Sequence, residues 1–218
     1  MIDKSELNDI LVSVLAISLA FTIAGIGGIF GLLGGARPDI LSFALLFAVS
    51  MFTVGIGFVL HEMAHKYLAI RFGCWAAYRA WPMGLLFALV SSLFGFIFAA
   101  PGATYIDPTY ARRFTHRENG LISLIGPLTN IALALLFAFA SPLFFALLPQ
   151  EIAALVLIQG VGINLWLALF NMLPMGPLDG TKVMRWNPLI WGVTIVFTAI
   201  ALFTGLFLRV GLAFASLY

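Results

Sequence analysis

The sequence predicts an all-α polytopic membrane protein, with five to six transmembrane helices and a membrane-embedded re-entrant loop or small β-hairpin after the second helix. Of its 218 residues, 62% are hydrophobic and only 9% are charged. Soluble domains carry roughly a quarter charged residues, and disordered chains have few hydrophobic ones, so the composition excludes both classes. Several apolar runs also reach the length of about 20 residues that a helix needs to cross a ~30 Å hydrocarbon layer.

Five apolar runs of sufficient length lie between charged residues. They are 10–33, 40–70, 121–148, 152–173 and 189–208. A sixth run, 81–104, is interrupted by Pro82, Gly84, Gly95, Pro101 and Gly102. Because proline and glycine disrupt regular helices, we predict an irregular structure for this run.

The positions of Lys and Arg predict how the chain crosses the membrane. If the run 81–104 does not cross, only Arg37 and Arg209 lie on one face and the other nine cations share the opposite face. Those nine are Lys4, Lys66, Arg71, Arg79, Arg112, Arg113, Arg117, Lys182 and Arg185. If the run crosses, most of this bias disappears. Cytoplasmic loops carry excess Lys and Arg, so we predict a non-crossing re-entrant segment and a cytoplasmic N-terminus.

The composition also limits the domain organisation and the partners. The length predicts one domain, residues 1–218, and the near-balance of 11 cations and 9 acids gives no indication of nucleic-acid binding. The single cysteine, Cys74, excludes an intrachain disulfide and a multi-cysteine metal site. The first nine residues contain one lysine and three acids, unlike the basic start of a signal peptide, so we expect the first apolar run to be retained.

The second run contains the pattern H-E-x-x-H at His61, Glu62 and His65. On a helix the two histidines lie one turn apart on one face, so both imidazoles can bind one metal ion. The carboxylate of Glu62 can then reach a water molecule at the metal without taking a coordination position. The alternative is a polar cluster that only packs helices together, for which Ser, Thr and Asn are the usual residues.

The depth of this motif favours a functional site. His61 lies ten residues before Arg71, which we interpret as the membrane boundary. At 1.5 Å per residue this places His61 ~15 Å below the surface, where ionisable side chains are costly.

A catalytic zinc ion needs a third protein ligand, and Asp179 is the best candidate. It follows a span that ends near Leu173, in a segment that Pro174, Gly176 and Pro177 keep from continuing as a helix. The alternative role for Asp179 is to start a short helix and pair with Lys182. The other candidates are His116, Glu118, Glu151 and Asp107, which we interpret as loop, helix-terminus or turn residues.

Three asparagines lie in the third and fourth full spans. Asn171 either binds substrate or the developing oxyanion, or makes a hydrogen bond between spans, and its spacing from Asn164 fits both roles. For Asn130 we favour a structural role, with Gly126 allowing a close approach to the helix of the histidines.

Together these residues resemble the site-2 protease family of intramembrane zinc metalloproteases. The resemblance rests on His61-Glu62-x-x-His65, Gly126-Pro-x-x-Asn130 and the segment from Asn171 to Gly180, and covers about residues 42–185. It implies one Zn²⁺ per chain bound by His61, His65 and Asp179, with Glu62 as the catalytic base and Asn171 in substrate binding. Many members have Asp-Gly-Gly where Thr181 follows Gly180 here. The length leaves no room for a PDZ or CBS domain, so we expect a minimal catalytic core.

We therefore predict an intramembrane zinc metalloendopeptidase in the cell membrane, with its active-site opening on the cytoplasmic side. Its partners would be transmembrane-helix protein substrates and the lipid bilayer. The alternative is a catalytically silent membrane chaperone or scaffold of the same fold. A metal transporter is disfavoured because it would need further ligands along a pathway.

Overall fold

The structure is a computed structural model that describes residues 2–35, 37–97, 101–111 and 114–216. The chain forms two compact units. The first comprises Met1–Val59 and Ala76–Ile106, and the second comprises Leu60–Trp75 and Asp107–Tyr218.

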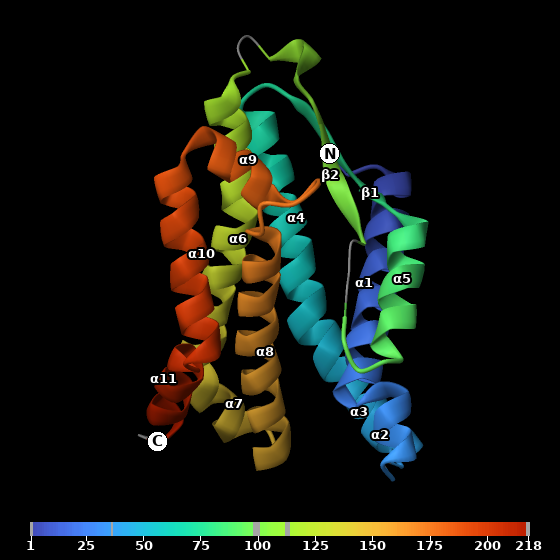
Figure 1. Cartoon of the computed structure of the whole chain (residues 1–218). Helices are drawn as coiled ribbons and strands as arrows, with labels where there is room; N and C mark the ends of the chain where they lie inside the picture. Colours follow the sequence, from blue (N-terminus) through green and yellow to red (C-terminus); the bar gives the residue numbers. More distant parts are fainter. Residues whose placement is uncertain (1, 36, 98–100, 112–113, 217–218) are drawn as a thin grey trace. The chain divides into compact units, whose positions relative to one another are not determined.

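The first unit is built around helix α1 (Lys4–Gly25), which packs against α3 (Ile40–Ser50), the π-helical turn η1 (Met51–Gly55) and α5 (Pro82–Ser92) (Figure 1). The short helix α2 (Gly28–Leu33) follows α1. Asp3 caps α1 by accepting a hydrogen bond from the Glu6 N–H over 2.7 Å. The π-helical turn lies directly before α4 (Ile56–Arg71), the helix that carries the histidines.

A two-stranded sheet, β1 (Trp75–Ala80) and β2 (Gly102–Asp107), belongs largely to the first unit. Tyr78 of β1 is fully buried: its N–H donates to the Glu6 carboxylate over 3.0 Å, and its hydroxyl lies 2.8 Å from that of Ser13. The N–H of Trp81 donates to the Pro101 carbonyl, so the end of β1 lies beside the beginning of β2. These bonds fix the sheet to α1.

The small sheet after the second long helix is as predicted, and the structure adds a regular helix, α5, between its two strands, where the prolines and glycines of the run 81–104 indicate irregular structure. Pro82 stands in the first turn of α5, where its missing N–H costs nothing. The helix has 11 residues and is therefore ~16 Å long, too short to cross the bilayer. Residues 98–100 of this run lie outside the described residues.

The second unit is helical and contains most of α4. It further contains α6 (His116–Phe139), α7 (Ser141–Leu147), α8 (Gln150–Asn171), α9 (Asp179–Trp186), α10 (Pro188–Phe203) and α11 (Leu206–Ala215). Helix α6 packs along α8 and α9, α10 packs on the same two helices, and α11 contacts α6 and α7 (Figure 1). The start of α6 is fixed by a capping box, in which the side chains of Thr115 and Glu118 each accept a hydrogen bond from the other residue's backbone N–H group.

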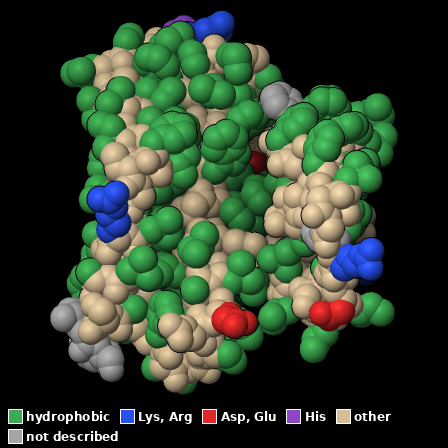
Figure 2. Space-filling view, turned by 60° about the horizontal axis from the view of Figure 1, so that its bottom comes forward, with side chains coloured by type: hydrophobic (Ala, Val, Ile, Leu, Met, Phe, Trp, Pro, Cys, Tyr) green, Lys and Arg blue, Asp and Glu red, His purple; other side chains and the backbone are tan. Residues whose placement is uncertain are grey.

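Four helical segments are long and apolar enough to cross a membrane: Lys4–Leu33, Ile40–Arg71, His116–Phe139 and Gln150–Asn171. The pair α10 and α11, bent by 53°, makes a fifth if it is one span. Figure 2 shows a face covered mainly by hydrophobic side chains. These features confirm an all-α polytopic membrane protein with a small sheet after the second long helix.

One predicted span is shorter than expected. The apolar run 121–148 divides into α6 and α7, with a turn at Ala140. Pro142 has no N–H for the ladder of α6, and Ser141 is buried with its hydroxyl bonded to the Gly211 carbonyl over 2.6 Å. Apolar composition alone does not reveal this break.

The contact between α6 and α8 predicts a difference between two glycines of α8. A Cβ on Gly160 would lie 2.4 Å from the Phe137 ring, whereas one on Gly162 would meet nothing within 4 Å. We expect Gly160→Ala to destabilise the protein by about 1–3 kcal/mol through overpacking. Gly162→Ala, the matched control, should be neutral or stabilise by up to ~1 kcal/mol. Thermal unfolding in detergent measures both, and equal stability of the two variants would contradict this packing.

Candidate metal centre

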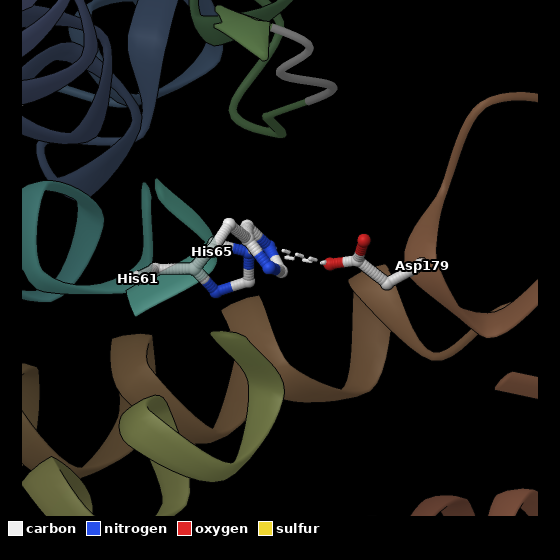
Figure 3. Close-up of side chains that lie close together, drawn as sticks. All are labelled: His61, His65 and Asp179. Atoms are coloured by element: carbon white, nitrogen blue, oxygen red, sulfur yellow. Dashed lines mark hydrogen bonds and ion pairs between the residues drawn. The ribbon is translucent and has the colours of Figure 1, made fainter. Parts of the chain in front are cut away.

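Helix α4 brings His61 and His65 together. Both side chains are buried, and their Nε2 atoms lie 2.9 Å apart. The ring centroids are 4.6 Å apart with the ring planes nearly perpendicular. Both imidazoles therefore point their Nε2 atoms at one place, as predicted from their spacing of one helical turn (Figure 3).

Asp179 reaches the same place from the first residue of α9. Its Oδ2 lies 3.0 Å from Nε2 of His65 and 3.4 Å from Nε2 of His61 (Figure 3). Its other oxygen, Oδ1, lies 3.8 Å from Nζ of Lys182. Asp179 thus takes both positions considered from the sequence: it starts a short helix paired with Lys182, and it faces the two histidines.

The backbone around Asp179 is held by close contacts with the end of α8. A Cβ on Gly180 would lie 2.1 Å from the carbonyl oxygen of Met172, so only glycine fits there. The same carbonyl accepts a hydrogen bond of 2.8 Å from the indole N–H of Trp191 on α10. Met172 and Val183 are completely buried and pack with Leu124 of α6. These contacts determine where the Asp179 carboxylate lies.

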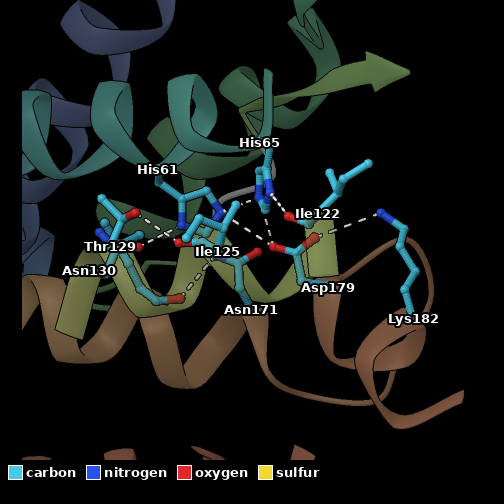
Figure 4. A network of polar contacts seen from close by, with 10 residues as sticks. His61, His65, Ile122, Ile125, Thr129, Asn130, Asn171, Asp179 and Lys182 are labelled. Carbon is cyan, nitrogen blue, oxygen red and sulfur yellow. Dashed lines mark hydrogen bonds and ion pairs between the residues drawn. The ribbon is translucent and has the colours of Figure 1, made fainter. Parts of the chain in front are cut away.

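One face of α6 holds the rings of both histidines (Figure 4). Nδ1 of His65 lies 2.6 Å from the Ile122 carbonyl oxygen, and Nδ1 of His61 lies 2.6 Å from Oδ1 of Asn130. Gly126 lies between these contacts in the sequence, and a Cβ there would come within 2.5 Å of the His65 ring. This confirms the close approach predicted for Gly126. The absence of a side chain there leaves room for both imidazoles.

The three residues fit a tetrahedral metal ion. One ligand atom from each lies within 4.8 Å of the others, and all three residues are buried. Zn–N and Zn–O bonds of 2.0–2.2 Å place neighbouring ligand atoms roughly 3.3 Å apart, close to the distances given above. An anionic oxygen and two imidazoles form a typical zinc ligand set.

Glu62 and Asn171 are the other two predicted site residues. Glu62 lies on α4 with the histidines, and Asn171 lies at the end of α8, eight residues before Asp179. Glu62 follows His61 on α4 and is 8% exposed. Lys66, one turn further along this helix, is also buried. Asn171 ends α8 and donates one amide hydrogen to the Leu167 carbonyl over 3.0 Å (Figure 4). Because a carboxamide has two N–H groups, this bond uses only half of its donor capacity.

The other candidate ligands occupy helix ends and turns. Glu118 accepts the Thr115 N–H over 2.8 Å, and Asp107 accepts the Thr109 N–H over 2.9 Å. Bonds from Thr109 lower the pKa of Asp107. Glu151 lies in the first turn of α8, and His116 begins α6. Among the described residues, the group of metal-ligating side chains is His61, His65 and Asp179.

Asn130, for which the sequence favours a structural role, makes a contact with His61 that we did not predict. Its Oδ1 bonds a ring nitrogen of His61, and its Nδ2 donates to Asn164 on α8 over 2.9 Å. The four-residue spacing of Ile122, Gly126 and Asn130 is the signal that could have placed them on one helix face.

Curated proteins that are similar to this chain include three named as zinc metalloproteases. "Putative zinc metalloprotease MJ0611" of Methanocaldococcus jannaschii is 41% identical over 191 residues, which cover 87% of this chain and 88% of the relative. "Putative zinc metalloprotease YwhC" of Bacillus subtilis is 32% identical over 61% of this chain and 66% of its own. "Putative zinc metalloprotease Rip2" of Mycobacterium tuberculosis is 30% identical over a stretch that covers 75% of this chain and 66% of the relative. No family model and no solved structure matches the chain.

The contact at Gly126 predicts that metal binding fails when a methyl group is added there. In Gly126→Ala the new Cβ would displace both imidazoles, so we expect zinc affinity to fall at least about tenfold, as when a ligand loses its orientation. Gly192→Ala on α10 is the control, because its Cβ would meet nothing within 4 Å. Zinc titration of the purified proteins measures the effect. Unchanged affinity in Gly126→Ala would contradict the described packing of α4 on α6.

Proposed function

The chain belongs to the site-2 protease-like family of zinc metalloproteases, and we propose that it hydrolyses peptide bonds within the transmembrane segments of other proteins. It is a metalloprotease of the membrane with several spans. The intramembrane substrate and the roles of individual residues are the proposed part.

One observation carries the proposal. Two imidazoles from a long apolar helix and one carboxylate from a separate segment converge, buried, with a geometry that suits zinc. The segment Ile40–Arg71 is continuously helical and apolar, so His61 keeps the depth inferred from its distance to Arg71. Ionisable groups at such depth are costly and usually serve a function.

His61, His65 and Asp179 would hold the zinc ion. When bound, zinc supplies a Lewis acid that polarises a carbonyl group and makes water acidic enough to lose a proton near neutral pH. Gly126, Ile122 and Asn130 would keep the imidazoles oriented, and Lys182 lies beside the outer oxygen of Asp179.

Glu62 would act as the general base. Its position directly after His61 gives its carboxylate access to a water molecule beside the histidines. It would take a proton from this water and pass it to the leaving amine, a role that contributes typically 10²–10⁴-fold to rate. Asn171 would donate its second amide hydrogen to the substrate backbone or to the developing oxyanion.

The proposed substrate is a transmembrane helix of another protein, met within the lipid bilayer. The peptide bonds of such a helix are already hydrogen-bonded and covered by side chains. The helix must therefore unwind locally before hydrolysis, and its released backbone groups need new partners.

We also propose that the N-terminus and the site opening are cytoplasmic. Support comes from the excess of Lys and Arg on the face that carries Lys66, Arg71, Lys182 and Arg185. Arg112 and Arg113, which contribute to this excess, lie outside the described residues.

The ligand assignment predicts the metal content of three proteins. Wild type should bind one zinc ion per chain, whereas His61→Ala and Asp179→Ala should each lose at least about a hundredfold in affinity, because each removes one of three ligands. His116→Ala is the control, since this histidine lies at the start of α6 and outside the cluster. Metal analysis after dialysis gives the stoichiometry. Full zinc content in Asp179→Ala would overturn the assignment.

The base assignment separates the protease from a silent scaffold. Glu62→Gln preserves size and removes the base, so it should keep its zinc and lose at least about a hundredfold in cleavage rate of a membrane-embedded reporter. Cleavage by purified protein in detergent or vesicles is the measurement. If wild type is as inactive as Glu62→Gln while both bind zinc, the scaffold function is correct.

A further inference from the structure

Two asparagines connect His61 to the backbone of α8. Asn130 and Asn164 have no exposed surface. Nδ2 of Asn130 donates to Oδ1 of Asn164 over 2.9 Å, and Nδ2 of Asn164 donates to the Gly160 carbonyl over 2.8 Å. With the contact between Asn130 and His61, this makes a chain of three hydrogen bonds.

This chain has one direction. The carbonyl of Gly160 can only accept, so Asn164 must present its NH₂ group to it and its oxygen to Asn130. That oxygen also only accepts, so Asn130 must present its NH₂ group to Asn164 and its own oxygen to His61. Nδ1 of His61 is therefore the donor in the last bond, and its proton is fixed on this nitrogen.

We propose that Asn164 and Asn130 are positioning residues that fix the His61 tautomer and leave its Nε2 atom to bind the metal. The inference rests on the proposed zinc site. Neither asparagine belongs to the metal-ligating group, and Asn164 acts only through Asn130. Partners of this kind orient metal-bound histidines and typically contribute 10- to 100-fold to metal affinity.

A comparison with His65 explains why two asparagines are present. The Nδ1 atom of His65 faces the backbone carbonyl of Ile122, which has no donor to offer. An asparagine can turn its amide by 180° and present either oxygen or nitrogen, so Asn130 alone would leave the proton of His61 unspecified. Asn164 removes this ambiguity by accepting from Asn130. The direction of these hydrogen bonds is set by the Gly160 carbonyl, a backbone group that cannot turn.

The first test is Asn164→Leu, which keeps similar volume and removes the acceptor for Asn130. Asn130 can then turn its NH₂ group toward His61 and favour the tautomer whose proton blocks Nε2. We expect zinc affinity of the purified full-length protein to fall by about 10- to 100-fold. Thr129→Val is the control: Thr129, the neighbour of Asn130 on α6, donates its hydroxyl to the Ile125 carbonyl over 2.8 Å (Figure 4).

The second test is rescue by Asn130→Asp in the Asn164→Leu background. A carboxylate offers an acceptor to His61 in either orientation, so it no longer needs Asn164. We expect zinc affinity to return to within about threefold of wild type, as in carboxylate–histidine–zinc arrangements. Histidine ¹⁵N spectra, which identify the protonated nitrogen of a neutral imidazole, should show the Nδ1–H form of His61 in wild type and in the double variant.

The outcomes are distinct. If the asparagines serve in packing alone, the double variant binds zinc no better than Asn164→Leu, and this result would overturn the proposed positioning role of Asn130 and Asn164. Wild-type zinc affinity in Asn164→Leu would also overturn it. A wild-type protein that binds no zinc would instead overturn the proposed function, on which the positioning role of the two asparagines depends.

Discussion

The imidazoles of His61 and His65 lie against α6 at Gly126, where any side chain would overlap both rings. Ile122 and Asn130, four residues to either side, accept from the Nδ1 atoms of the two rings. Three positions at a spacing of four residues share one helix face, so a single stripe of α6 sets the position of both histidines. This face can hold both rings because its middle residue has no side chain and its outer residues provide hydrogen-bond acceptors, the Ile122 carbonyl oxygen and Oδ1 of Asn130.

The side chains of this site are buried, which makes each polar contact costly to lose. A buried polar group without a partner costs about 1–3 kcal/mol, and an unpaired charge costs more. The two asparagines, the ring nitrogens and the oxygens of Asp179 all meet partners. Helix α8 ends at Asn171, and the indole N–H of Trp191 donates a hydrogen bond to the Met172 carbonyl that follows. The irregular segment before Asp179 is therefore tolerated at this place.

Much of this arrangement was predictable because its signals are local. The H-E-x-x-H spacing predicted that both imidazoles share one helix face. The distribution of Lys and Arg predicted a topology in which Asp179 lies on the same side of the membrane as His65. Helix α5 and the turn at Ala140 were not predictable, because apolar composition reports length and not the point where a chain turns. The contact of Asn130 with His61 was missed for another reason: it joins residues 69 positions apart, and no local pattern encodes that pairing.

Helix α8 links the two parts of the site. At its middle, Asn164 accepts from Asn130 and thereby sets the orientation of the amide that His61 contacts. At its end, the Met172 carbonyl lies so close to Gly180 that a side chain there is excluded, which fixes the start of α9 and with it Asp179. A displacement of α8 along α6 would disturb the donor pattern behind His61 and the position of the carboxylate together. The close packing of α6 on α8, with Phe137 against Gly160, therefore holds the histidine and carboxylate ligands in register.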